Sequence, residues 1–303
     1  MSGGSDLLVN MKFKLDTPKV LISLNGLPEL QTVEELPDGS LRIGGGCKLT
    51  DLIKNPLIVA QCPALRDALY GVASRHIRNV GTLGGNLCLD TRCWYTNQSE
   101  QWRDKREGCF KTGPDLCHVL KTATRCHAIN SSDSAPLLIA IGASVTLASH
   151  TGEREVPLID FYRDDGVHHT VLESGEILVA VTVPRFEGRA IFAKLSQREG
   201  LDFAAGTFAA AVAGPNDHLE SVRLVVNSMG AAPKVLIVSE QILKKSGLTD
   251  EGIEKAALAA RGTMGEITNI FTPSGYKRRL VKALIRDALV ELREQPAGNE
   301  ASR

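Results

Sequence analysis

The sequence has no long apolar run, no excess of either charge and few aromatic residues. Its 303 residues hold 35 Lys and Arg against 35 Asp and Glu, so the formal net charge is zero. A chain without a clustered basic excess is not expected to bind nucleic acid. No apolar run reaches the roughly 18 residues that a membrane helix needs, and the N-terminus lacks the pattern of a signal peptide. We therefore predict a cytoplasmic protein that does not enter a membrane.

Disulfide bonds are not expected either, although cysteine is present. An odd number of cysteines in a long chain without a secretory signal argues against a disulfide framework. Five of them fall between positions 88 and 126, and the seven are Cys47, Cys62, Cys88, Cys93, Cys109, Cys117 and Cys126. This clustering predicts a metal centre. Cys47, Cys62 and Cys88 are interpreted as buried structural thiols.

Short apolar runs and turn residues predict an α+β chain with a boundary near residues 184–188. The runs at residues 19–24 and 41–46 are typical of strands, with a tight turn at 37–39 between them. A helix is expected to begin at Pro63 and to continue toward Gly81.

A second short helix should contain Pro136 in its first turn, with Ser132 or Asp133 as its cap, and a strand should follow it. Beyond residue 189 the patterns predict strands and then helices. The last helix is expected from Ser274 to about Glu294 because an apolar face repeats there.

Residues 90–130 are polar and show no sustained helical or strand period. A structureless segment of this length inside a domain is uncommon and is usually functional. It contains the spacing C-x15-C-x7-C-x8-C, formed by Cys93, Cys109, Cys117 and Cys126. Four thiolates can hold zinc or an iron–sulfur cluster. Structural zinc sites usually pair cysteines only about two to four residues apart, so the spacing favours a cluster and leaves zinc as the alternative.

Two glycine-rich stretches, "SGGSDLL" at residues 2–8 and "GTLGGN" at residues 81–86, are candidate anion-binding turns. Glycine lets backbone N–H groups approach an anion, and a neighbouring hydroxyl can add a donor. Neither stretch matches a Rossmann fingerprint or a Walker A loop. On their residues alone, plain turns are the commoner interpretation, and "GGG" at residues 44–46 is interpreted as a turn or bulge.

Three motifs in the same order, "GGSDLLVNMK", "IRNVGTLGGNL" and "SSDSAPLLIAIGA", closely resemble the FAD-binding medium subunit of the xanthine dehydrogenase, or molybdenum hydroxylase, family. The resemblance implies that the two glycine loops clamp the FAD pyrophosphate and that a Ser-Asp pair also binds FAD. It further places a leucine and a lysine near the flavin, with Asp202 as the acidic residue after the lysine. The implied FAD-binding residues are Gly3, Gly4, Ser5, Asp6, Leu7, Gly81, Thr82, Gly84, Gly85, Asn86, Ser132, Asp133, Leu178 and Lys194.

The resemblance also implies an FAD-binding PCMH-type fold, like that of vanillyl-alcohol oxidase, with two subdomains in residues 1–184. A C-terminal α+β domain of the CO dehydrogenase flavoprotein type, with a small sheet and helices, is expected at 185–295, and a tail at 296–303. Family members carry a strand and a helix ahead of the first glycine loop, whereas this chain begins almost at that loop. We expect either a truncated start or an FAD domain that lacks its first strand.

The insert at residues 90–130, with its flanking "LCLDTRC" and "SSD", is similar to that of 4-hydroxybenzoyl-CoA reductase flavin subunits, where four cysteines bind a [4Fe–4S] cluster. The resemblance implies an electron-transfer subunit with FAD and a [4Fe–4S] cluster. Its partners would be a large molybdenum-cofactor subunit and a small [2Fe–2S] subunit, in a dimer of heterotrimers. Electrons would pass from a ferredoxin through the cluster and FAD toward molybdenum, for reductive dehydroxylation of an aromatic CoA thioester.

Other functions stay open. The chain can instead be the flavin subunit of an aldehyde or N-heterocycle dehydrogenase of the same family, a zinc-stabilised binding module without a redox role, or a flavoenzyme that acts alone. His168, in "DDGVHHT", either stacks on the flavin or is a surface residue.

Overall fold

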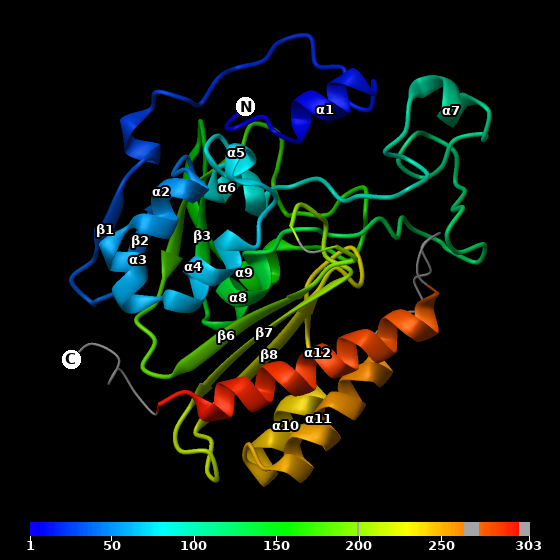
Figure 1. Ribbon diagram of the computed structural model, residues 1–303. Helices are drawn as coiled ribbons and strands as arrows, with labels where there is room; N and C mark the ends of the chain where they lie inside the picture. Colours follow the sequence, from blue (N-terminus) through cyan, green and yellow to red (C-terminus); the bar gives the residue numbers. More distant parts are fainter. Residues whose placement is uncertain (199, 264–272, 297–303) are drawn as a thin grey trace.

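The computed structural model describes residues 1–198, 200–263 and 273–296, and it folds into two α+β units that pack against each other (Figure 1). In this described part, the first unit is built on a five-stranded sheet and the second on a four-stranded sheet. Within the same ranges, no helix is long and apolar enough to cross a membrane.

The first sheet has the strand order β1-β2-β5-β3-β4, and every neighbouring pair is antiparallel. The strand bounds are Val33–Glu35 (β1), Leu41–Gly44 (β2), Ser144–Ser149 (β3), Gly152–Pro157 (β4) and Ile177–Val183 (β5). The sequence of β5, ILVAVTV, is rich in β-branched residues, which suit its central position between two neighbours.

The helices of the first unit are short; α2 to α6 gather on one side of the sheet, whereas α7 lies out on the insert (Figure 1). Their bounds are Leu7–Lys12 (α1), Pro28–Leu30 (a 3-10 helix), Leu49–Lys54 (α2), Pro56–Gln61 (α3), Pro63–Tyr70 (α4), Arg75–Arg78 (α5), Leu83–Leu87 (α6), Glu100–Asp104 (α7), Ala135–Ala140 (α8) and Leu158–Phe161 (α9).

Three local predictions in this unit need correction. Residues 19–24 are not a strand: they lie outside both sheets, and Val20 and Ile22 are 75% and 74% exposed. The helix that begins at Pro63 ends at Tyr70 rather than continuing toward Gly81, because the chain turns through a left-handed residue at position 73. The N-cap position of α8 is Ser134, one residue beyond the predicted pair, although the capping hydroxyl, which accepts from the N–H of Ala135, is that of Ser132.

The second sheet has the antiparallel order β6-β7-β8-β9 and carries three helices on one face. The bounds are Arg189–Leu195 (β6), Gly206–Ala213 (β7), Ser221–Asn227 (β8), Lys234–Val235 (β9), Ile237–Ser246 (α10), Asp250–Thr263 (α11) and Ser274–Glu294 (α12). The predicted last helix is confirmed: its apolar residues at 281, 285, 288, 289 and 292 are buried.

One of the two apolar core clusters extends across the junction of the units, and the other lies between the second sheet and its helices. Helix α8 packs on β7 and β8 from the face opposite α12 and α10. Ala209 and Ala211 of β7 belong to the same buried cluster as α8. Small side chains on this strand let a helix approach the sheet closely, so the sequence GTFAAAVA suits a strand that is covered on both faces.

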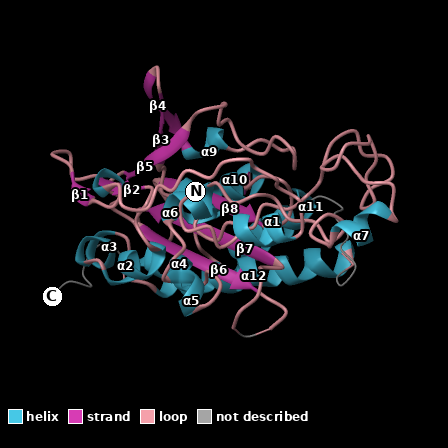
Figure 2. Cartoon of the chain, turned by 90° about the horizontal axis from the view of Figure 1, so that it is seen from above, coloured by secondary structure: helices cyan, strands magenta, loops and turns pink. Residues whose placement is uncertain are grey.

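The cysteine-rich insert extends from the first unit as a long loop. Between residues 93 and 128, all of which the structure describes, its only regular element is the short helix α7. Its neck is closed by an isolated antiparallel bridge in which Arg92 and Ile129 exchange two backbone hydrogen bonds of 2.8 Å. The insert projects at the end of the molecule away from β1 (Figure 2). Beyond the bridge, Arg92 bonds to Asp6 of the first glycine loop and Ser132 bonds to Asn86 of the second.

Candidate functional site

The two glycine loops lie against each other. The hydroxyl oxygens of Ser2 and Thr82 are 2.8 Å apart, and a Cβ on Gly3 would lie 2.1 Å from the carbonyl oxygen of Val80. Thr82 is also the N-cap of α6, where its hydroxyl accepts a hydrogen bond of 3.1 Å from the N–H of Gly85. Because no side chain fits at position 3, glycine there is required by the contact between the loops.

The glycines of the two loops differ in their surroundings. A Cβ on Gly84 would lie 2.8 Å from the carbonyl oxygen of Gly45, so Gly84 is needed for packing. Gly85, in contrast, is exposed. Gly4 has a φ of 69°, a backbone conformation that favours glycine. Gly85 in the second loop and the half-buried Gly3 and Gly4 in the first thus leave glycine backbone accessible in both loops, as an anion-binding cradle needs.

Buried hydrogen bonds connect the second loop to the Ser-Asp motif. The Oδ1 atom of Asn86 accepts bonds of 2.9 Å and 2.7 Å from the hydroxyls of Ser132 and Ser134. Both serines are fully buried, and Asn86 is 8% exposed. Ser132 in turn accepts a bond from the N–H of Ala135 at the start of α8. The motifs at 81–86 and 132–134, which are far apart in sequence, thus form one polar assembly.

Asp133 and Lys194 form a buried ion pair between the two units, with an oxygen–nitrogen distance of 2.7 Å. Lys194 also donates to the carbonyl of Gly71. Burial raises the pKa of Asp133 to about 6, and the attraction of Lys194 only partly opposes this. The second carboxylate oxygen, Oδ1, is buried and has no hydrogen-bond partner in the protein. A buried acceptor of this kind is expected to have a partner, so Oδ1 is available to a ligand.

A polar stripe that the sequence analysis missed extends from Lys194 across the second sheet. Thr207 pairs with Lys194 on one side and with Asn227 on the other. The side-chain amide of Asn227 donates to Asn130 Oδ1 at 2.9 Å and to the carbonyl of Ser132 at 2.8 Å. Thr207 Oγ1, Asn227 Oδ1 and Asn130 Nδ2 are buried without partners. The available signal was one threonine in an otherwise apolar strand sequence and one asparagine at the end of the next strand.

Asp6 and Leu7, predicted in the first loop, lie at the start of α1, whereas Ser5 is exposed. Asp6 pairs with Arg92 at 2.6 Å. Burial raises the pKa of Asp6, and Arg92 opposes that shift. The Arg92 guanidinium also lies 4.3 Å from the ring centre of Phe203, in the loop between β6 and β7. Arg92 therefore joins the first glycine loop, the second unit and, through its neighbour Cys93, the insert.

The remaining predicted flavin-side residues do not meet Asp133. Leu178 is buried in the core beside Gly45, which in turn contacts Gly84. Asp202 pairs with Arg198 at 3.4 Å. His168 is exposed, and its backbone N–H donates to Asp165, which fits the surface interpretation of this histidine.

The four cysteines of the insert act on one another electrostatically. Burial raises the pKa of the Cys93 thiol, and the charges of Cys109 and Cys117 raise it further. Burial also raises the pKa of Cys126 to about 11, with added contributions from Cys93 and Cys109. Cys93 is thus within electrostatic reach of the other three thiols, as a common site requires.

Backbone N–H groups point at these sulfurs. Leu120 donates to Cys117 Sγ and Ala128 to Cys126 Sγ, each at 3.4 Å. The backbone of Tyr95 and Thr96 lowers the pKa of Cys93 in the same way. Hydrogen bonds to cysteine sulfur stabilise thiolates and tune iron–sulfur clusters. Across the described residues, no three His, Cys, Asp or Glu side chains are placed to hold a single metal ion. Cysteine thiols with backbone N–H donors are the kind of ligand that iron–sulfur clusters take.

Cys126 is held from behind by a residue that the sequence did not single out. A Cβ on Gly166 would lie 2.7 Å from Cys126 Sγ and 2.8 Å from the N–H nitrogen of Ala128. The N–H of Gly166 donates to the carbonyl of Cys126 at 3.0 Å. Only glycine fits at this contact, so the loop at 166 fixes the position of the cysteine.

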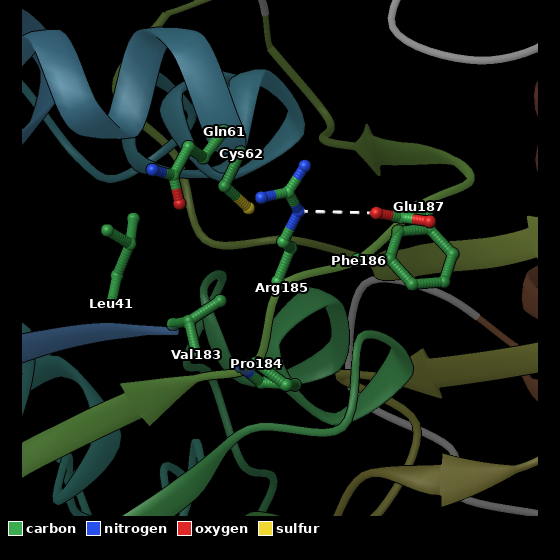
Figure 3. A pocket seen from close by; sticks show the side chains of 8 residues that line it. All are labelled: Leu41, Gln61, Cys62, Val183, Pro184, Arg185, Phe186 and Glu187. Carbon is green, nitrogen blue, oxygen red and sulfur yellow. Dashed lines mark ion pairs between the residues drawn. The ribbon is translucent and has the colours of Figure 1, made fainter. Parts of the chain in front are cut away.

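Cys47 and Cys62 lie in the core, as predicted, and the partly buried Cys88 packs against it. Burial raises the pKa of the thiols of Cys47 and Cys62 to about 11 and that of Cys88 to about 12. Cys62 also lines a cavity of about 140 Å³ at the segment that joins the two units, together with Leu41, Gln61 and residues 183–187 (Figure 3). Arg185 and Glu187 form an ion pair of 3.3 Å there. None of the residues predicted to bind FAD or a cluster lines this cavity.

Comparisons with known proteins agree with this arrangement. Residues 1–186 match the family described as the FAD binding domain in molybdopterin dehydrogenase, and residues 191–292 match the CO dehydrogenase flavoprotein C-terminal domain. The chain belongs to the FAD-binding subunits of the molybdenum hydroxylase family. The predicted fold class and family are therefore confirmed, and the residues of the glycine-loop cradle lie in the family's FAD-binding domain.

Several relatives of this molybdenum hydroxylase subunit are known. The FAD-binding subunit PaoB of an Escherichia coli (strain K12) aldehyde oxidoreductase is 35% identical over 222 residues, which are 70% of each chain. The carbon monoxide dehydrogenase medium chain of Hydrogenophaga pseudoflava is 25% identical over 95% of this chain and 87% of its own.

Solved structures show the same fold. A carbon monoxide dehydrogenase structure from Hydrogenophaga pseudoflava superimposes with a TM-score of 0.78 at 24% identity, over 96% of this chain and 88% of that one. Quinoline 2-oxidoreductase from Pseudomonas putida 86 gives a TM-score of 0.79 at 22% identity, over 97% and 88%.

Proposed function

We propose that this flavin subunit transfers electrons within a molybdenum hydroxylase complex, holding FAD in the glycine-loop cradle and an iron–sulfur cluster in the insert. When bound, FAD supplies the exchange between one-electron and two-electron transfer, while the protein orients and tunes it. The residues at 3–7, 81–86 and 132–133 would hold the FAD. Cys93, Cys109, Cys117 and Cys126 would hold the cluster, which we propose to be [4Fe–4S].

The hydrogen bonds at the cysteine sulfurs support the cluster. The four cysteines come from separate turns of one insert. Backbone N–H donors point at three of the four sulfurs, at Cys93, Cys117 and Cys126. Four cysteines with such donors are the usual ligands of an iron–sulfur cluster.

For the reaction, the relatives favour substrate oxidation. Their names include an aldehyde oxidoreductase, a carbon monoxide dehydrogenase and a nicotine 6-hydroxylase. We therefore propose that the complex oxidises an aldehyde or an N-heterocycle. The names "FAD-binding subunit" and "medium chain" support separate partners, which we propose to be a large molybdenum-cofactor subunit and a small [2Fe–2S] subunit, arranged as a dimer of heterotrimers.

The second candidate is 4-hydroxybenzoyl-CoA reductase, in which electrons would run toward molybdenum. The cysteine insert favours it, because an added cluster at the projecting end of the subunit gives a route of entry for a ferredoxin. An open pocket of about 530 Å³ on the insert is lined by Trp102, Lys105, Arg106, Glu107 and His118. Its basic residues suit an acidic partner. Two assays of the whole complex separate the candidates. Oxidation of an aldehyde or N-heterocycle with a dye acceptor would support the first candidate, and dehydroxylation of the CoA thioester with a low-potential donor would support the second.

Metal and flavin analysis tests the two cofactor sites. The complex is purified without oxygen, and iron, sulfide, zinc and flavin are measured for wild type, Cys109→Ser and the matched control Cys88→Ser. We expect about four irons and one FAD per chain, with iron lost and FAD kept in Cys109→Ser and both kept in Cys88→Ser. Zinc in place of iron, or no flavin, would overturn the proposal. The chain would then be interpreted as the zinc-stabilised binding module without a redox role.

A further inference from the structure

Lys111 is held rigidly beside the proposed cluster site. It follows Cys109 by two residues, and its side chain is 10% exposed. The ammonium nitrogen lies 2.7 and 2.8 Å from the two carboxylate oxygens of Asp90, and 2.8 and 2.9 Å from the carbonyl and hydroxyl oxygens of Thr91. Exposed lysine ion pairs are usually mobile and weak, whereas four contacts fix this charge in one place.

Thr91, which binds the Lys111 ammonium group, is connected to one of the proposed cluster ligands. Thr91 is buried and donates its hydroxyl to the carbonyl of Gly166 at 2.5 Å. Gly166 is the residue that contacts Cys126 Sγ from behind. A chain of contacts therefore leads from the ammonium group of Lys111 through Thr91 to the Gly166 backbone beside the sulfur of Cys126.

The same ion pair also acts on the first glycine loop. Asp90 lies between Asn86 of the second glycine loop and Cys93 of the insert. At Asp6, where burial raises the pKa, the negative charge of Asp90 adds to the rise and Lys111 opposes it. Both charges of the pair thus act at Asp6, and along the chain Asp90 lies between the second glycine loop and the first proposed cluster ligand, Cys93.

We propose that Lys111 and Asp90 set the reduction potential of the iron–sulfur cluster, Lys111 raising it and Asp90 lowering it. The inference rests on the proposed cluster. Reduction adds one electron, and so one negative charge, to the cluster. A fixed cation nearby stabilises that charge and a fixed anion destabilises it, more strongly in a poorly solvated site than in water. Neither residue is a ligand, and both act as positioned charges.

Opposite shifts in two single variants test this charge effect. In the purified complex, the midpoint potential of the cluster is measured by electron paramagnetic resonance at poised potentials for wild type, Lys111→Met, Asp90→Asn and the double variant. We expect Lys111→Met to lower the reduced-to-oxidised ratio at a fixed potential about tenfold, or about 59 mV for one electron. Asp90→Asn should raise it, and the double variant should lie near wild type.

The controls separate this inference from the cluster assignment. Lys105→Met removes the same charge from an exposed position in the insert and should leave the potential unchanged, as should Lys111→Arg. Wild type without iron would overturn the proposed cluster itself. Iron present in all variants, with potentials that do not move or that move in the same direction for both single variants, would overturn only the charge effect. If Lys111→Met loses its iron, the upward shift of Asp90→Asn decides the matter alone.

Discussion

Replacing Lys194 by Met tests the buried ion pair at the junction of the two units. The side chains of Lys194 and Asp133 are 13% and 6% exposed, and their charged atoms are 2.7 Å apart. Removing one partner of a buried pair costs about 3–5 kcal/mol, because the remaining charge stays buried without compensation. We expect Lys194→Met to lower the free energy of unfolding of the flavin-free chain by about this amount at pH 7.5.

The stability loss in Lys194→Met should depend on pH, because the Asp133 carboxyl titrates. Burial raises the pKa of Asp133 in the folded chain to about 6 from its ordinary value of 3.8. A carboxyl with a raised pKa takes up a proton on folding, so its favourable contribution is present below pH 3.8 and is lost as the pH rises through 6. At about 1.4 kcal/mol per pKa unit, the wild-type loss is about 3 kcal/mol. Without Lys194 the pKa rises further, so the variant loses more at pH 7.5 than at pH 5.

Urea unfolding followed by circular dichroism at pH 5 and pH 7.5 measures both effects. The double variant Lys194→Met/Asp133→Asn removes the charge as well and should recover most of the stability. Lys255→Met, which breaks an exposed pair with Glu251, is the matched control and should change stability by less than about 1 kcal/mol. An equal loss for Lys194→Met at both pH values, or a double variant no more stable than the single one, would refute the reasoning.

Three further substitutions test the cradle and the insert. Gly166→Ala places a methyl group 2.7 Å from Cys126 Sγ, so bound iron should fall while bound flavin stays; unchanged iron would contradict the contact. Gly84→Ala places a methyl group 2.8 Å from the Gly45 carbonyl, and the opposite result, flavin lost and iron kept, is expected from the same assay. Arg103, 8% exposed, donates to two backbone carbonyls. Arg103→Met should lower the free energy of unfolding by about 2 kcal/mol, and thermal melting that matches wild type would contradict this.

Patterned elements could be predicted from the sequence, because their burial repeats along the chain. The apolar face of α12 and the β-branched run of β5 each carry their own signal. The run at 19–24 carries a similar signal but lies outside both sheets. A short apolar run forms a strand only where a partner strand is available. The run itself does not show whether such a partner exists.

The site was predictable only as far as its motifs are local. The cysteine spacing indicates a ligand set, and the glycine loops indicate a cradle. The stripe from Lys194 through Thr207 to Asn227 depends on strand register, and the contact of Gly166 with Cys126 joins loops 40 positions apart (166 − 126). Neither relation is visible in a single sequence, because a one-residue change of register would reverse which side chains face the junction.

The insert and the FAD-binding unit differ in what stabilises them. None of residues 93–128, all of which the structure describes, belongs to either of the two apolar core clusters. The insert is held at its neck by the Arg92–Ile129 bridge and at its side by Arg103, while the core around α8 is complete without it. Metal binding to such a segment is also its folding energy. Loss of a cysteine ligand should therefore unfold the insert alone. Flavin that stays bound to Cys109→Ser would show that the FAD-binding unit folds without the insert.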